Sequence, residues 1–150
     1  MQTGAVMLRN IVDTNVLVSA LIQKSFPYLI IYHHFINGEF ELCVSDELIA
    51  EYYDVLQRPK FQKFHDFYIK AESLLSSIES RAVKYQSDKA IQLIADEADN
   101  RLLEIADSSN ADYIITGNTN HFNFARFQHT RIVTPKQYWE EHGFPSLSAI

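Results

Sequence analysis

The stretch that decides the fold runs from residue 9 to residue 22 and reads RNIVDTNVLVSALI. A short apolar segment ends at Val12, Asp13-Thr14-Asn15 follows, and a second apolar segment of helical character comes next. We predict a buried strand over residues 8–13 and a helix over residues 15–24. Asp, Thr and Asn are good helix N-caps, so a strand-to-helix turn accounts for polar residues here. The rest of the chain decides whether capping is the whole role of this carboxylate.

The length and composition of the chain fit one globular domain over residues 1–150. It is 47% hydrophobic and 21% charged, which is ordinary for such a domain. The net charge of −6 argues mildly against broad electrostatic binding of nucleic acid, although carboxylates that recruit a metal ion lower the same count. The single cysteine, Cys43, lies in an apolar stretch, and we expect a buried thiol.

Targeting signals are not evident in the sequence. The chain does not open with a basic segment followed by an apolar one, as a signal peptide would. No apolar run approaches the roughly 18 residues that a membrane span needs. We therefore expect a cytoplasmic protein that does not associate with a membrane.

Apolar periodicity and turn residues predict alternating strands and helices along the chain. Beyond residue 24 we expect helices over 27–37, 45–57, 60–80, 97–109 and 135–142, and strands over 41–44, 81–85, 112–116 and 131–134. The strands are short and apolar throughout, as expected when helices cover both faces of a sheet. The pattern predicts an α/β fold, a three-layer α/β/α sandwich around a mostly parallel sheet of four to five strands.

Polar residues with oxygen atoms follow four of the five predicted strands. Ligands of open parallel sheets bind outside the carboxyl ends of the strands, so these residues share one edge. A single polar turn is explained by capping, whereas four at one edge indicate a site. The four positions are Asp13-Thr14-Asn15, Ser45, Thr116-Gly117-Asn118 and Thr134.

Two predicted helices add carboxylates to that edge. Glu51 lies roughly 60° from Leu48 around its helix, at the border of the apolar stripe. Asp99 falls in the middle of the apolar stripe of its own helix, where an unpaired carboxylate is costly. Mg²⁺ and Mn²⁺ prefer hard oxygen ligands. We therefore predict a divalent metal site built by Asp13, Glu51 and Asp99.

Each of these acids also has an ordinary structural interpretation. Asp13 can be a cap, Glu51 a solvated helix residue, and Asp99 a first-turn acid favoured by the helix dipole.

A metal-dependent phosphatase or phosphate receiver is another enzymatic interpretation. Such a protein would use Asp13 as a nucleophile and usually needs a lysine near the phosphate. No lysine follows a central strand, since Lys136 comes one residue into the last predicted helix.

Several motifs, in this order and spacing, resemble the PIN-domain family over about residues 8–141. They are VDTNVLVSAL at 12–21, Ser45-x-x-Leu48-x-x-Glu51, D-x-x-D-N-x-x-L-E-x-A at 96–106, ADYIITGN at 111–118, HF at 121–122 and IVTP at 132–135. More narrowly, the chain resembles the bacterial PIN branch described as toxin components of toxin–antitoxin systems, akin to VapC toxins.

This resemblance implies a ribonuclease that cleaves single-stranded RNA and depends on Mg²⁺ or Mn²⁺. Asp13, Glu51 and Asp99 match the three central metal-binding acids of the family, and His121 is expected to orient the site or contact phosphate. The resemblance also implies a cognate antitoxin, a homodimer and the toxin role in a type II pair. The supporting positions are Thr14, Asn15, Ser45, Asp96, Thr116, Asn118 and His121.

Two features leave alternatives open. Asn118 stands where many PIN domains have a fourth Asp, and an amide brings an oxygen without a charge, which disfavours a second metal ion. The alternative to an enzyme is a catalytically weak or inert PIN-fold binding module. The aromatic segment 60–70, KFQKFHDFYIK, has a helical period that favours core packing with a solvated face. The same segment could instead form a dimer face or a wall of the RNA groove.

Overall fold

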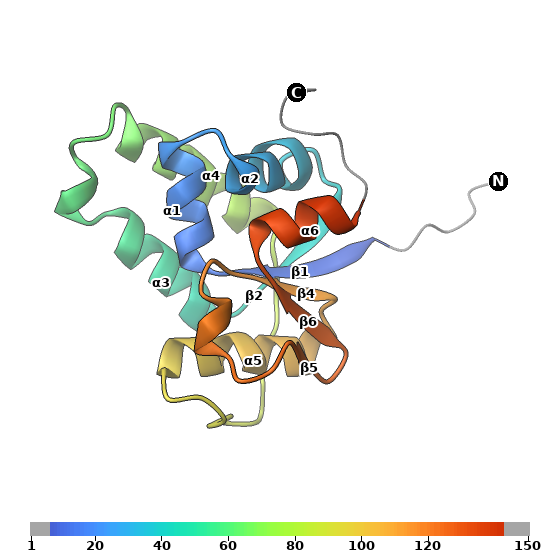
Figure 1. Ribbon diagram of the computed structural model, residues 1–150. Helices are drawn as coiled ribbons and strands as arrows, with labels where there is room; N and C mark the ends of the chain where they lie inside the picture. Colours follow the sequence, from blue (N-terminus) through green and yellow to red (C-terminus); the bar gives the residue numbers. More distant parts are fainter. Residues whose placement is uncertain (1–6, 143–150) are drawn as a thin grey trace.

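A computed structural model describes residues 7–142, so the two ends of the predicted 1–150 domain lie outside the described residues. Within this range six strands form one sheet in the order β3-β2-β1-β4-β6-β5 (Figure 1). All neighbouring strands are parallel except β5 and β6. The strands are β1 (Leu8–Val12), β2 (Phe40–Val44), β3 (Val83–Lys84), β4 (Tyr113–Ile115), β5 (Arg126–Phe127) and β6 (Thr130–Val133).

Helices cover both faces of this sheet, which confirms the predicted α/β/α sandwich. Helix α5 lies along one face, while α1, α2, α4 and α6 lie on the other, and α3 stands beside the end of β1 (Figure 1). The helices are α1 (Thr14–Ile22), α2 (Phe26–Tyr28), the π-helix η1 (Leu29–Phe35), α3 (Asp46–Leu56), the 3₁₀ turn η2 (Pro59–Phe61), α4 (Phe67–Arg81), α5 (Glu97–Ser109), the 3₁₀ turn η3 (Thr119–His121) and α6 (Pro135–Glu141).

Three details of the prediction were wrong. The sheet has six strands rather than four or five, because the two-residue strand β5 pairs with β6 across a hairpin and is too short to show a pattern. The helix expected over 60–80 begins at Phe67, after Asp66 in the left-handed conformation with φ of 55°. Most of the helix expected over 27–37 is a π-helix rather than an α-helix.

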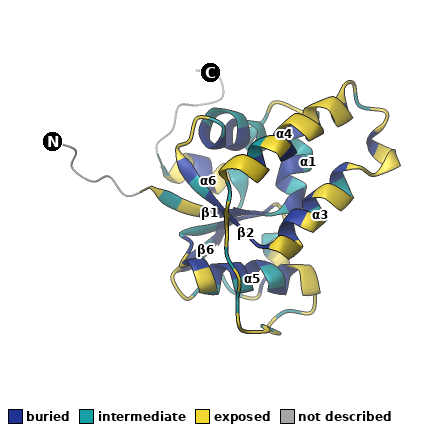
Figure 2. Cartoon of the chain, turned by 180° about the vertical axis from the view of Figure 1, so that it is seen from behind, coloured by how far each residue is buried: buried dark blue, intermediate teal, exposed yellow. Residues whose placement is uncertain are grey.

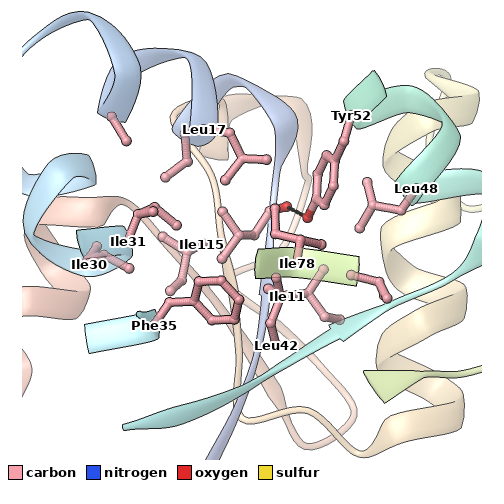
Figure 3. Packing of buried hydrophobic residues seen from close by; sticks show 14 of the residues in the cluster. Ile11, Leu17, Ile30, Ile31, Phe35, Leu42, Leu48, Tyr52, Ile78 and Ile115 are labelled. Carbon is pink, nitrogen blue, oxygen red and sulfur yellow. Dashed lines mark hydrogen bonds between the residues drawn. The ribbon is translucent and has the colours of Figure 1, made fainter. Parts of the chain in front are cut away.

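The core lies where the central strands meet the helices. Figure 2 shows the interior strands as buried and much of the outward surface of α4 as exposed. In Figure 3, Leu17 of α1 and Tyr52 of α3 point towards Ile115 and the sheet. These side chains are fully buried, and burying an apolar side chain of this size stabilises the fold by about 1.5–3 kcal/mol.

The predicted buried thiol is confirmed. Cys43 of β2 has no exposed surface, and burial, with the neighbouring Glu41 carboxylate, raises its pKa to about 12. Within residues 7–142, no single helix is long and apolar enough to cross a membrane, while the bent pair Thr14–Ile22 and Phe26–Phe35 passes by length and composition alone.

The strand order places a change of winding direction beside β1. From β1 the chain builds β2 and then β3 on one side, and afterwards builds β4, β6 and β5 on the other side. In open α/β sheets such a switch point leaves a crevice at the carboxyl ends of the two strands, where ligands bind. Here the two strands are β1 and β4, whose carboxyl ends lead into Asp13 and Thr116.

Candidate metal centre

A cleft of about 420 Å³ opens at the carboxyl edge of the sheet. Asp13 follows β1, Glu51 comes from α3, and Asp99 comes from the first turn of α5. The structure therefore brings the three predicted metal ligands to one cleft from three separate elements. The other polar residues that line it are Thr14, Asn15, Ser19, Arg58, Lys60, Asp96, Asn118 and His121.

Asp13 caps α1, but capping does not account for both of its oxygens. Oδ1 accepts a hydrogen bond from the backbone N–H of Thr14 at 2.8 Å. Oδ2 accepts one from the Thr116 hydroxyl at 2.7 Å, which comes from the turn after the neighbouring strand β4. Burial raises the pKa of Asp13 above its ordinary value, and these two hydrogen bonds offset part of that rise. The carboxylate is thus fixed in position at an energetic cost.

Two hydrogen bonds, one of Glu51 and one of its neighbour Tyr52, hold this part of α3 at the edge of the cleft. One of its carboxylate oxygens accepts a hydrogen bond from the Thr14 hydroxyl, the residue that follows Asp13. The next residue, Tyr52, donates from its hydroxyl to the carbonyl of Val12 at 2.5 Å, which Figure 3 shows from close by. Helix α3 and the Glu51 side chain are therefore linked to the segment that carries Asp13, at the end of β1.

Asp99, Asp96 and His121 form a compact group of possible metal donors. One ligand atom from each lies within 4.8 Å of the other two. Asp99 is only 5% exposed, and its Oδ2 lies 3.0 Å from Nδ1 of His121. Burial raises the pKa of Asp99, the nearby Asp96 carboxylate raises it further, and His121 opposes the shift. Carboxylate oxygens and an imidazole nitrogen are donors that suit Mn²⁺, and the carboxylates suit Mg²⁺.

This group differs from the predicted triad in two respects. Asp96 and His121 join Asp99 directly, whereas Asp13 and Glu51 line the same cleft with oxygens engaged by Thr14 and Thr116. Asp96 also caps α5, because its Oδ1 accepts from the N–H groups of Ala98 and Asp99. The donor set fits a hard divalent cation, since carboxylates that repel one another gain from a positive charge between them, and one of them, Asp99, is buried.

The turn after β4 supports this centre. The Thr116 hydroxyl, which donates to Asp13, also accepts from the N–H of Asn118 at 3.0 Å. Asn15 Oδ1 accepts from the N–H of Gly117 at 3.4 Å, so the turns after β1 and β4 are joined directly. Asn118 lines the cleft as well, and its amide adds an oxygen without adding a charge.

Two of the four polar turns form helix caps outside the lining of the cleft. Ser45 is buried, its hydroxyl accepts from the N–H of Leu48 at 3.1 Å, and it does not line the cleft. Thr134 forms a capping box with Gln137 at the start of α6. Neither residue lines the cleft in this structure, and a supporting role of Ser45 in the site stays a prediction.

The predicted site residues did not include three cleft residues that follow α3. Arg58, Lys60 and Phe61 all line the cleft. The ring of Phe61 stacks on Phe67 at 4.6 Å between centroids, which agrees with core packing for these two rings of segment 60–70. Lys60 lines the cleft, a position that the groove-wall interpretation of segment 60–70 requires. The Arg-Pro pair before it, which ends α3 and starts η2, was the available signal that the chain turns back here.

Comparison with known proteins agrees with this arrangement. A family model described as PIN domain matches residues 9–120, which include every acid discussed above. Searches of the curated proteins and of the solved structures gave no match. Since the family model spans well over half of the chain, the protein belongs to the PIN-domain family, whose members are generally nucleases that use divalent metal ions.

Proposed function

We propose that this protein is an endoribonuclease that cleaves single-stranded RNA and depends on Mg²⁺ or Mn²⁺. The observation that carries the proposal is the meeting of Asp13, Glu51 and Asp99 in one cleft, with Asp96 and His121 beside Asp99. A structural role alone does not explain four carboxylates facing one solvent-filled space, because like charges at close range cost stability.

The chain's own residues divide the work of such a site. Asp13 and Asp99 would hold the ion together with Asp96, and Glu51 would hold it or orient the attacking water. A bound Mg²⁺ or Mn²⁺ lowers the pKa of a coordinated water and stabilises the charge that grows on the phosphate. Thr116 keeps Asp13 in place, and His121 orients Asp99. Because water attacks rather than the ribose 2′-hydroxyl, the products carry 5′-phosphate and 3′-hydroxyl ends.

The biological setting belongs to the same proposal. We infer that the protein is the toxin of a type II toxin–antitoxin pair, with a cognate antitoxin that covers the cleft, a homodimeric state and a cytoplasmic location. These points rest on the resemblance to the VapC-like branch. Co-purification with the product of a neighbouring gene, with loss of RNA cleavage in the complex, would support them.

Cleavage of a labelled single-stranded RNA with Mn²⁺ or Mg²⁺ tests the activity. Wild type and Asp13→Asn are purified identically, and EDTA is included as a control. We expect cleavage by wild type alone, abolished by EDTA. Equal cleavage by both proteins indicates a contaminating nuclease, and 2′,3′-cyclic phosphate products formed in EDTA contradict the mechanism.

The second candidate is an inert binding module with the same fold, which the uncharged Asn118 favours. Thermal unfolding in Mn²⁺ or Ca²⁺ separates the two candidates. A metal-induced rise in melting temperature that depends on Asp13 supports a working metal centre. A phosphate receiver is a weaker alternative, and a phosphoryl group trapped on Asp13 would be its signature.

A further inference from the structure

Two cations stand on the rim of a cleft that is otherwise acidic. Arg58 and Lys60 flank Pro59 between α3 and the turn η2, and both line the same cleft as the four carboxylates. Cations at a rim facing carboxylates would ordinarily form ion pairs with them. The partners of Arg58 and Lys60 therefore show whether these cations are neutralised by the cleft or are available to a ligand.

Neither cation is neutralised by the carboxylates of the cleft. Within residues 7–142, Lys60 forms no salt bridge, and its ammonium lies 5.3 Å from the ring centroid of Phe61. Arg58 contacts Asp54 at 3.2 Å, one turn back on α3. Both partners of that pair are well exposed, so the contact is weak and easily exchanged for another anion.

The backbone that carries these two side chains is fixed from both ends. The Tyr68 hydroxyl donates to the carbonyl of Arg58 at 2.6 Å. Phe61, only 7% exposed, is anchored by its stacking on Phe67. The positions of the two cations relative to the cleft are thus set by the fold, while their exposed ends remain available to a ligand.

We propose that Arg58 and Lys60 form a phosphate-binding site that holds a phosphodiester of the single-stranded substrate next to the one cleaved. The inference rests on the proposed function and extends it to substrate recognition. A nucleic acid that reaches an acidic cleft on a protein of net charge −6 must be attracted locally. Two cations at the rim supply that attraction, because phosphate contacts account for most nonspecific affinity. Val18 and Val55 of the cleft wall offer apolar contact to a sugar or base.

The chain offers a closely matched control for Lys60. Lys63 lies three residues further along, is exposed, and places its ammonium 5.4 Å from the ring centroid of Phe64. It has the same charge and the same kind of ring contact but does not line the cleft. A difference between Lys60→Ala and Lys63→Ala therefore reports position in the cleft and not net charge.

The test combines steady-state cleavage of a labelled single-stranded RNA in Mn²⁺ with binding of the same RNA at several KCl concentrations in EDTA. For Lys60→Ala we expect KM and the dissociation constant to rise about three- to fivefold, and for Arg58→Ala/Lys60→Ala about tenfold. The salt dependence of binding should fall by about 0.7 in log–log slope for each phosphate group that the variant no longer neutralises. We expect kcat and the Mn²⁺-induced rise in melting temperature to stay at wild-type values, and Lys60→Arg to restore KM.

The outcomes separate this inference from the nuclease function. If wild type cleaves RNA in an Asp13-dependent way and Lys60→Ala matches Lys63→Ala in KM and salt slope, the phosphate site is wrong and the nuclease function stands. If no Asp13-dependent cleavage is found but Lys60→Ala weakens RNA binding and Lys63→Ala does not, the nuclease function is wrong, and the phosphate site stands as an RNA-binding site without a neighbouring cleavage site. Absence of both binding and cleavage in wild type overturns both.

Discussion

The turns after β1 and β2 have similar local structures but make different contacts. Each follows a buried parallel strand, and each ends in a polar residue with extended backbone that caps a helix. The Ser45 hydroxyl accepts from the N–H of Leu48, within its own helix, and has no other hydrogen-bond partner among residues 7–142. Asp13 bonds both to its own helix and to Thr116 of the neighbouring strand's turn.

The strand order explains this difference. β1 and β4 are the neighbours between which the winding of the chain reverses, and such a reversal leaves a crevice at the carboxyl ends of the strands. β2 lies one strand away on the side where winding continues, and Ser45 is covered. A polar residue after a strand is thus a candidate ligand at the reversal and an ordinary cap elsewhere. The predictions that follow test this distinction.

The largest contrast is expected in catalysis. Asp13→Asn should reduce RNA cleavage by at least about 100-fold, because it removes a negative ligand from the proposed metal centre while keeping the shape of the cap. Ser45→Ala should leave kcat per folded molecule unchanged. Single-turnover cleavage by both variants, normalised to the folded fraction, checks this. Loss of kcat in Ser45→Ala at full folding would contradict the distinction.

The second contrast concerns metal binding and stability together. Asp99→Asn should abolish the rise in melting temperature caused by Mn²⁺, because it removes the buried carboxylate from the group of donors that Asp99 forms with Asp96 and His121. In EDTA the same variant should melt a few degrees above wild type, since it relieves a buried charge whose pKa is raised. Differential scanning calorimetry in both buffers measures both effects. A lower melting temperature in EDTA would show that the Asp99 charge stabilises the fold.

A smaller effect is expected on the stability of the other turn. Ser45→Ala should cost about 1 kcal/mol, the usual effect of removing a helix cap, and should lower the melting temperature by about 2–4 °C. Mn²⁺ should raise the melting temperature of this variant as much as that of wild type. Urea unfolding with and without Mn²⁺ provides the measurement. A reduced metal effect would mean that Ser45 helps to form the centre after all.

The smallest effect is a dependence on pH. An acid whose pKa is raised by folding stabilises the folded state below its unfolded pKa of 3.8, and this contribution is lost as pH rises through the folded value. In EDTA, the stability of Asp99→Asn relative to wild type should therefore grow from about pH 4 upward and then level off. The stability of Ser45→Ala relative to wild type should not change over the same range. Urea titrations at a series of pH values give both differences.

Much of the site was predictable because periodicity reports on burial. The helix over 97–109 was predicted at its observed ends, and an acid in the middle of its apolar stripe correctly indicated that Asp99 is buried. The placement of Glu51 at the border of its stripe likewise agrees with its position in the cleft.

The rest depended on turns that carry no periodic signal. His121 reaches Asp99 only because the 3₁₀ turn η3 follows the Thr116 turn. Lys60 reaches the cleft because Pro59 and the left-handed Asp66 interrupt what looked like one long helix. Amphipathic spacing continues through such breaks, so it located the elements and placed Lys60 in a helix that begins only at Phe67. The expectation for His121 came from the family resemblance and not from periodicity.

The buried thiol of Cys43 makes the protein its own unfolding reporter. It is the chain's single cysteine, it has no exposed surface, and its pKa of about 12 keeps it protonated at neutral pH. A thiol reagent therefore reacts only with molecules whose central strands have opened. The labelling rate of each variant, read with or without metal and RNA, gives the frequency of global opening without any added probe, and it distinguishes variants that lose function from variants that lose the fold.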